Sequence, residues 1–176
     1  MKRILIALLP LMALISCKKG IDELPPVSQT GANTFGAKVN GNLWAPQGFG
    51  PIPANDILEA RMSGHDIVIN ARNFASSPNE TEFQLTIFNV TAPGVYPFNT
   101  DVVHPNGAAS YGYYVKRNMT PQDEWITSST NTGSVTITKI DDVNRIVAGT
   151  FQFNAGSLYN SGVLVVTEGR FDVKIQ

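Results

Sequence analysis

Apolar and polar residues alternate with a period of two along most of the chain after residue 33. Near its end, Phe171, Val173 and Ile175 are separated by charged residues. Because successive side chains of a β-strand point to opposite faces, this period predicts half-buried strands. The pattern recurs over 35–39, 43–45, 57–62, 66–71, 82–87, 95–98, 109–116, 124–128, 134–138, 147–153 and 168–175. In the last segment the charged residues are expected to face water as a ladder of alternating sign: Glu168, Arg170, Asp172 and Lys174.

Turn residues separate these segments. Asn40-Gly41 is typical of a two-residue hairpin turn of type I′, in which both residues take a positive φ. Pro93-Gly94 favours a type II turn. No stretch of the sequence after residue 33 has the 3.6-residue period of an amphipathic helix. We therefore expect an all-β fold, an antiparallel two-sheet sandwich of about ten strands, with a partly closed β-barrel as the alternative.

The N-terminal residues follow a different pattern. Lys2 and Arg3 precede an apolar run over 4–15 that only Pro10 interrupts. A membrane-spanning helix needs about 20 apolar residues, so this shorter run predicts the apolar region of a signal peptide. The run ends in Leu14-Ile15-Ser16-Cys17, which resembles the lipobox of bacterial lipoproteins.

That resemblance implies a lipid on Cys17 and cleavage between Ser16 and Cys17. An ordinary secretory signal, or a free thiol in a cytosolic protein, is the alternative. We expect a signal peptide over 1–16, a lipidated Cys17 with a flexible tether over 17–33, and one domain over 34–176. Lipoproteins carry two or three acyl chains, which makes anchoring effectively permanent. Lys18, where inner-membrane lipoproteins commonly have Asp, favours the outer membrane, with the domain facing the periplasm or exposed at the surface.

Charge excludes one class of partner. Residues 1–16 hold two of the 13 basic residues and none of the 14 acidic ones, so the rest has a net charge near −3. Such a chain has no basic stripe for nucleic acid. The expected partners are the membrane, through the lipid on Cys17, and a glycan or an envelope protein.

Two blocks of sequence bracket the expected domain. They are TGANTFGAKVNG over 30–41 and VTEGRFDV over 166–173. Together with the lipobox they resemble a family of uncharacterised cell-envelope lipoproteins of Bacteroidetes. That family has no assigned activity, so the resemblance implies an envelope address and an all-β fold and supplies no functional residue.

Aromatic residues provide the candidate binding surface. The segment 109–116 carries tyrosines on both faces, Tyr114 among them, so one face should present a tyrosine to solvent or to a groove. Trp125 would lie beside Tyr114 if the two segments pair, and an aromatic plane next to Glu124 suits a sugar ring. Trp44 is a second candidate platform. The alternative is that all these rings fill the core.

Other chemistry has few candidates. His65 and His104 could serve a hydrolase with a hydroxyl from elsewhere in the chain, because catalytic triads assemble across the sequence. Asp141, Asp142 and Asn144 lie in one predicted loop and could offer oxygens to Ca²⁺, although a solvated turn explains them equally well. We assign no catalytic residue, no cofactor and no metal ligand beyond these three candidates.

The sequence therefore favours a noncatalytic, lipid-anchored binding or interaction module of the cell envelope. One alternative is an envelope hydrolase that uses His65 or His104. Another is a structural subunit of a surface assembly, in which an exposed edge strand pairs with a neighbour.

Overall fold

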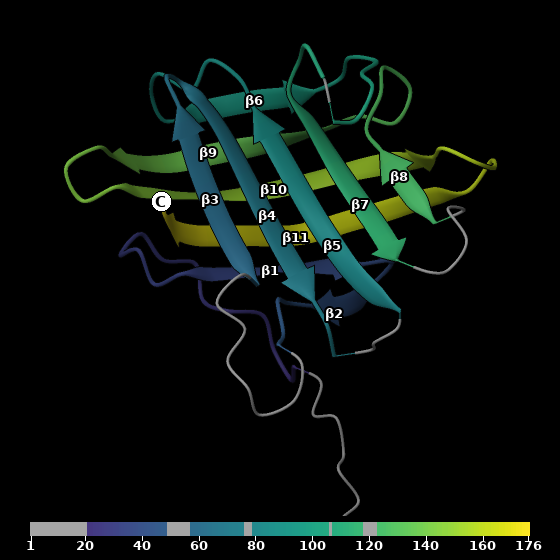
Figure 1. Cartoon of the computed structure of the whole chain (residues 1–176), viewed down its shortest axis with the longest axis horizontal. Helices are drawn as coiled ribbons and strands as arrows, with labels where there is room; N and C mark the ends of the chain where they lie inside the picture. Colours follow the sequence, from purple (N-terminus) through teal and green to yellow (C-terminus); the bar gives the residue numbers. More distant parts are fainter. Residues whose placement is uncertain (1–20, 49–56, 76–78, 106, 118–122) are drawn as a thin grey trace, which may run out of the picture.

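A computed structural model of the chain describes residues 21–48, 57–75, 79–105, 107–117 and 123–176. These residues form eleven strands and no helix (Figure 1). The strands are β1 (Thr34–Val39), β2 (Asn42–Trp44), β3 (Leu58–Ser63), β4 (Asp66–Asn73), β5 (Glu80–Ile87), β6 (Gly94–Phe98), β7 (Tyr111–Arg117), β8 (Glu124–Ile126), β9 (Gly133–Asp141), β10 (Ile146–Ser157) and β11 (Val163–Lys174). The predicted fold class is confirmed, and the last three strands are longer than expected. Among the described residues, no helix has the length and hydropathy needed to cross a membrane.

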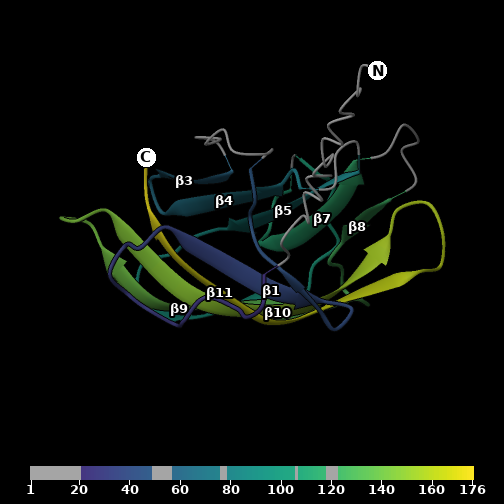
Figure 2. The ribbon, with the colours of Figure 1, turned by 90° about the horizontal axis from the view of Figure 1, so that it is seen from below.

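All the strands belong to one antiparallel sheet. Its order is β2-β1-β11-β10-β8-β7-β5-β4-β3, and β9 pairs with both β10 and β6. Figure 2 shows the sheet curled into two layers, with β3, β4, β5, β7 and β8 in one layer and β1, β9, β10 and β11 in the other. The layers join where Trp125 and Ile126 of β8 pair with Ser157 and Gly156 of β10. A single curled sheet thus combines the expected sandwich with the alternative, a partly closed barrel.

The first hairpin has the expected turn. Asn40 has a φ of 48° and Gly41 a φ of 80°, as a type I′ turn requires. This turn pairs Ala37 with Trp44 and places both side chains in the core.

The core between the two layers is aromatic. The Phe83 ring of β5 lies near its centre, with centroid distances of 4.6 Å to Trp44, 4.8 Å to Tyr114 and 5.5 Å to Phe35. Phe151 of β10 reaches the same ring from the other layer, at 6.1 Å. Because rings from both layers meet there, Phe83 connects the two halves of the curled sheet.

The last strand corrects one prediction. Phe171, Val173 and Ile175 are buried as expected, but Asp172, expected to face water, is only 1% exposed. The outward face of β11 at Asp172 is covered by Ser28, Thr30, Gly31 and Ala32, which belong to residues 21–33, a segment that we call the strap. The expected flexible tether included these residues, but the structure places them against the sheet. The remaining tether residues, 17–20, lie outside the described residues.

Candidate functional site

The strap is held by one buried carboxylate. Oδ2 of Asp172 accepts hydrogen bonds from the Ser28 hydroxyl at 2.6 Å and the Thr30 amide at 2.8 Å, and Oδ1 accepts one from the Gly31 amide at 2.7 Å. The Ala32 amide donates a longer bond of 3.3 Å to Oδ2. Burial raises the pKa of Asp172, but these hydrogen bonds together outweigh it, and the pKa lies below its usual 3.8. The ionised carboxylate therefore fixes the strap to β11 at neutral pH.

The strap also lies directly on β1. A Cβ placed on Gly36 would be 2.7 Å from Pro25 Cδ and 3.2 Å from Leu24 Cδ2. Only a residue without a side chain permits this approach. Gly36 therefore sets how closely the strap packs.

We expect Gly36→Ala to displace the strap and to lower the free energy of unfolding by about 1–3 kcal/mol, the range for overpacked sites. Limited proteolysis within residues 21–33 and chemical denaturation measure the two effects. Gly94→Ala is the matched control, because a Cβ there would have its nearest neighbour 4.0 Å away. Equal cleavage of Gly36→Ala and the wild-type strap would contradict the close contact.

Beyond the strap, the two ends of the curled sheet approach each other. Residues that follow β11 and β2 contact β3 and the end of β4 along a line that we call the seam, which is only partly closed. The Gln176 amide donates a 2.9 Å hydrogen bond to the carbonyl of Ala60 in β3. The second contact is made by Gln47, whose carbonyl accepts a 2.9 Å bond from the Phe74 amide. The first half of β1 pairs with β11 only, since β2 pairs with residues 37–39 of β1. The edge of β1 at Phe35 is therefore left open at the seam.

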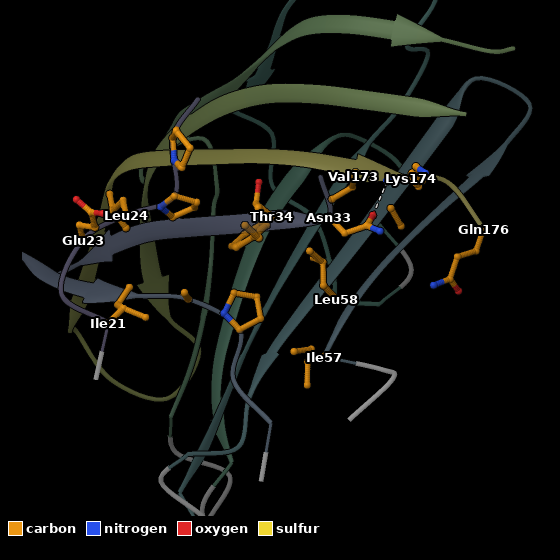
Figure 3. Close-up of a pocket in the computed structure, with 16 residues that line it drawn as sticks. Ile21, Glu23, Leu24, Asn33, Thr34, Ile57, Leu58, Val173, Lys174 and Gln176 are labelled. Atoms are coloured by element: carbon orange, nitrogen blue, oxygen red, sulfur yellow. Dashed lines mark hydrogen bonds between the residues drawn. The ribbon is translucent and has the colours of Figure 1, made fainter. Parts of the chain in front are cut away.

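A cavity of about 720 Å³ lies at this seam (Figure 3). The strap forms one wall with apolar residues, namely Ile21, Leu24, Pro25 and Pro26. The strands and the residues that flank them form the others, also with apolar residues, namely Phe35, Ala45, Pro46, Ile57, Leu58, Ala60 and Val173. Its volume falls within the range of about 300–1,000 Å³ that is typical of ligand pockets. The site is suited to an apolar ligand.

The cavity has five polar lining residues, and Thr34 is the one among them that is not exposed. Glu23, Lys174 and Gln176 are exposed. Oδ1 of Asn33 already accepts the Lys174 amide at 2.9 Å, the bond drawn in Figure 3. A ligand with several polar groups would need partners for them inside the site. The lining therefore favours a ligand that is mainly hydrocarbon.

The candidate aromatic platform is brought together, but inside the protein. Tyr114 pairs with Trp125 across β7 and β8, as expected, with ring centroids 5.9 Å apart. Tyr114 and Trp44 are each only 7% exposed and belong to the core, and the partly buried Trp125 packs against it. Tyr114 and Trp44 therefore follow the alternative interpretation, in which the rings fill the core, whereas Trp125 keeps part of its surface exposed. The opposite face of β7 carries a second apolar cluster, which includes Tyr111 and Tyr113.

The two histidines lie in different surroundings. His104 stacks on Tyr113, with centroids 3.8 Å apart, and its Nδ1 is 3.4 Å from the Tyr111 hydroxyl oxygen. Burial holds the pKa of His104 below its usual 6.5, so the ring is neutral at neutral pH. His65 is exposed in the turn between β3 and β4. Within the part of the chain that the structure describes, neither imidazole contacts a serine or threonine hydroxyl.

In the acidic hairpin loop over 141–144, the Asp141 carboxylate is already bound by neighbouring residues. Oδ1 of Asp141 accepts the Asn144 amide at 2.9 Å, and Oδ2 accepts the Asn144 side-chain amide at 2.9 Å. Lys139 Nζ lies 3.3 Å from the same carboxylate. These bonds to Asn144 and Lys139 lower the pKa of Asp141. Asp142 adds no further ligand, and the described residues contain no cluster of three His, Cys, Asp or Glu that could hold a metal ion.

Comparison with known proteins places residues 32–173 in a family model described as a domain of unknown function, DUF6252. The chain belongs to the DUF6252 family. This agrees with the expectation of an uncharacterised family. No curated protein and no solved structure matches the chain.

The DUF6252 match spans β1 to nearly the end of β11. Asp172 and Gly36, two of the sheet residues that contact the strap, lie inside it. The match begins at Ala32, so strap residues 21–31 lie outside it. The apolar cavity is therefore built from the DUF6252 domain on one side and from the preceding segment on the other.

Proposed function

We propose that this DUF6252 protein is a lipoprotein of the bacterial cell envelope, anchored in the outer membrane by acyl chains on Cys17. Its β-domain is a noncatalytic binding module, and the apolar cavity at the seam is its binding site. The observation that carries the proposal is the position of this cavity. Its wall begins at Ile21, only four residues after the cysteine of the lipobox.

The N-terminal sequence supports the anchor. Lys2 and Arg3, the apolar run over 4–15 and the small Ser16 before Cys17 together have the order of a lipoprotein signal. In that chemistry a lipid group replaces the hydrogen of the Cys17 thiol, and the peptide bond between Ser16 and Cys17 is hydrolysed. Each acyl chain adds affinity for the membrane, and two or more hold the protein effectively permanently.

The surroundings of the histidines favour binding over catalysis. His104 lies between two tyrosines, and His65 projects from a turn. Neither residue lines the cavity at the seam. A hydrolase needs a nucleophile and a base within reach of one pocket, which these positions do not provide.

The anchor is tested by expressing the full chain and its Cys17→Ser variant in a bacterium with lipoprotein processing. We expect the wild type almost entirely in the membrane fraction, with a mass that corresponds to residues 17–176 plus lipid. Cys17→Ser should leave that fraction or retain its leader, because no thiol is present to accept a lipid. Lys18→Ala is the control and should leave lipidation unchanged. A wild-type chain with an intact leader and an unmodified thiol would refute the proposal.

A further inference from the structure

We propose that the cavity at the seam receives an acyl chain of the lipid carried by Cys17 itself. This inference rests on the proposed lipid anchor and names the ligand of the proposed binding site. The domain would then bind one acyl chain of its own lipid modification, and the remaining acyl chains would insert into the membrane.

Chain length is the first argument. Ile21 lines the cavity, and three residues separate it from Cys17. An extended chain spans at most about 3.3–3.6 Å per residue, which puts the Cα atom of Cys17 within about 14 Å of that of Ile21. The strap is fixed to the sheet through Asp172 and Gly36, so this short connection starts from a defined point. The lipid is thereby confined to the neighbourhood of the cavity.

The shape of the cavity is the second argument. Figure 3 shows Ile21 and Leu24 at one end of the lining and Gln176 at the other, with Leu58 and Val173 between them. An acyl chain that enters beside Ile21 would meet apolar side chains along its path. No charged group is buried by this arrangement, because the charged lining residues are exposed.

Tethering is the third argument. A cavity of hydrocarbon side chains and a bilayer interior are similar environments for an acyl chain, so the effective concentration of the ligand decides occupancy. A ligand tethered by a short stretch of chain reaches an effective concentration on the order of millimolar. A chain of the Cys17 lipid and a chain of a surrounding lipid both leave the bilayer to enter the cavity, but only the Cys17 lipid is tethered beside it, which gives it the advantage.

Photocrosslinking in the full, lipidated chain tests the inference. Leu58 or Ile57, two residues of the same wall, is replaced in turn by the photoreactive residue p-benzoylphenylalanine, so that one position remains if the other perturbs folding. Val143, which is 93% exposed in the turn between β9 and β10, is the control position. Protein is irradiated in native membranes, digested and analysed by mass spectrometry.

We expect a crosslink between position 57 or 58 and an acyl chain on Cys17, assigned to the lipid by fragmentation of the crosslinked peptide, with a yield on the order of tenfold or more above that at position 143. The Cys17→Ser variant should lose it. A membrane phospholipid attached at position 58 would overturn the inference, because the occupant would be a different molecule. A lipid on Cys17 without any crosslink at either position would also overturn it and would leave the anchor proposal standing. An unmodified Cys17 would refute both.

Discussion

Replacing Asp172 by alanine should release the strap and lower the free energy of unfolding by about 3–5 kcal/mol. The side chain is 1% exposed and accepts hydrogen bonds from Ser28, Thr30, Gly31 and Ala32. Hydrogen bonds to a charged group contribute about 1.5–3 kcal/mol each, and loss of the acceptor leaves the buried Gly31 amide without a partner. Denaturant titration measures the stability, and proteolysis within the strap measures its release.

Glu168→Ala is the matched control for this experiment. Glu168 lies on the same strand and pairs with Lys38 at 2.6 Å, but its side chain is 50% exposed. Exposed ion pairs contribute only about 0–1 kcal/mol, so this variant should stay close to the wild type. If Asp172→Ala were no less stable than Glu168→Ala, the carboxylate would not hold the strap.

The same carboxylate predicts a response to acid. Its pKa in the folded protein is lowered below 3.8, so the unfolded chain binds the proton more tightly than the folded one. The stability that the ionised carboxylate contributes is complete at pH values well above 3.8, the pKa in the unfolded chain. It is lost as the pH falls through the lower pKa of the folded protein. The strap should therefore stay attached at neutral pH and loosen only in strong acid, and Asp172→Asn should weaken this pH dependence.

The strands were predictable because they depend on local alternation. Phe171, Val173 and Ile175 had to share one face, and their apolar character predicted that this face packs against the core. The pairing of Tyr114 with Trp125 was also predictable, since adjacent segments joined by a short connection pair antiparallel. Period-two patterns therefore gave the faces and several neighbours correctly.

The same patterns could not show what covers each face. Asp172 looked solvent-exposed because its neighbours alternate, and only the position of the strap explains its burial. The alternation left open whether Tyr114 lies at a surface or in the core, and the structure packs both sides of β7, with Tyr111 fully buried on the opposite face. Burial depends on segments distant in the sequence, and alternation carries no information about them.

The cavity was missed for a related reason. Its lining joins Ile21, Phe35, Leu58 and Val173, which only the curling of the sheet brings together. One signal was present in the sequence. Ile21 and Leu24, followed by Pro25-Pro26, are apolar and stiff residues in a segment that otherwise resembles a solvated tether. Apolar residues in a tether are a reason to expect docking against the domain, because exposed apolar surface favours burial.

Phe83→Ala should be the most destabilising single truncation in the core, lowering the free energy of unfolding by about 3–5 kcal/mol. The ring is fully buried and contacts Phe35, Trp44, Tyr114 and Phe151, which come from four different strands of both layers. Its removal takes away both buried apolar area and the ring contacts, and leaves a void between the layers.

Thermal and chemical denaturation followed by near-ultraviolet circular dichroism measure this loss, because Trp44 and Tyr114 report the packing around the void. Val95→Ala is the control. Val95 on β6 is 67% exposed, so its truncation should remove no core contact. A loss of less than about 1 kcal/mol for Phe83→Ala would contradict the packing, because a cavity of this size cannot close without moving one of the layers. Comparison of Asp172→Ala with Phe83→Ala also separates attachment of the strap from packing of the core. Asp172→Ala should release the strap and leave the aromatic core intact, whereas Phe83→Ala should weaken the core to which the strap is attached.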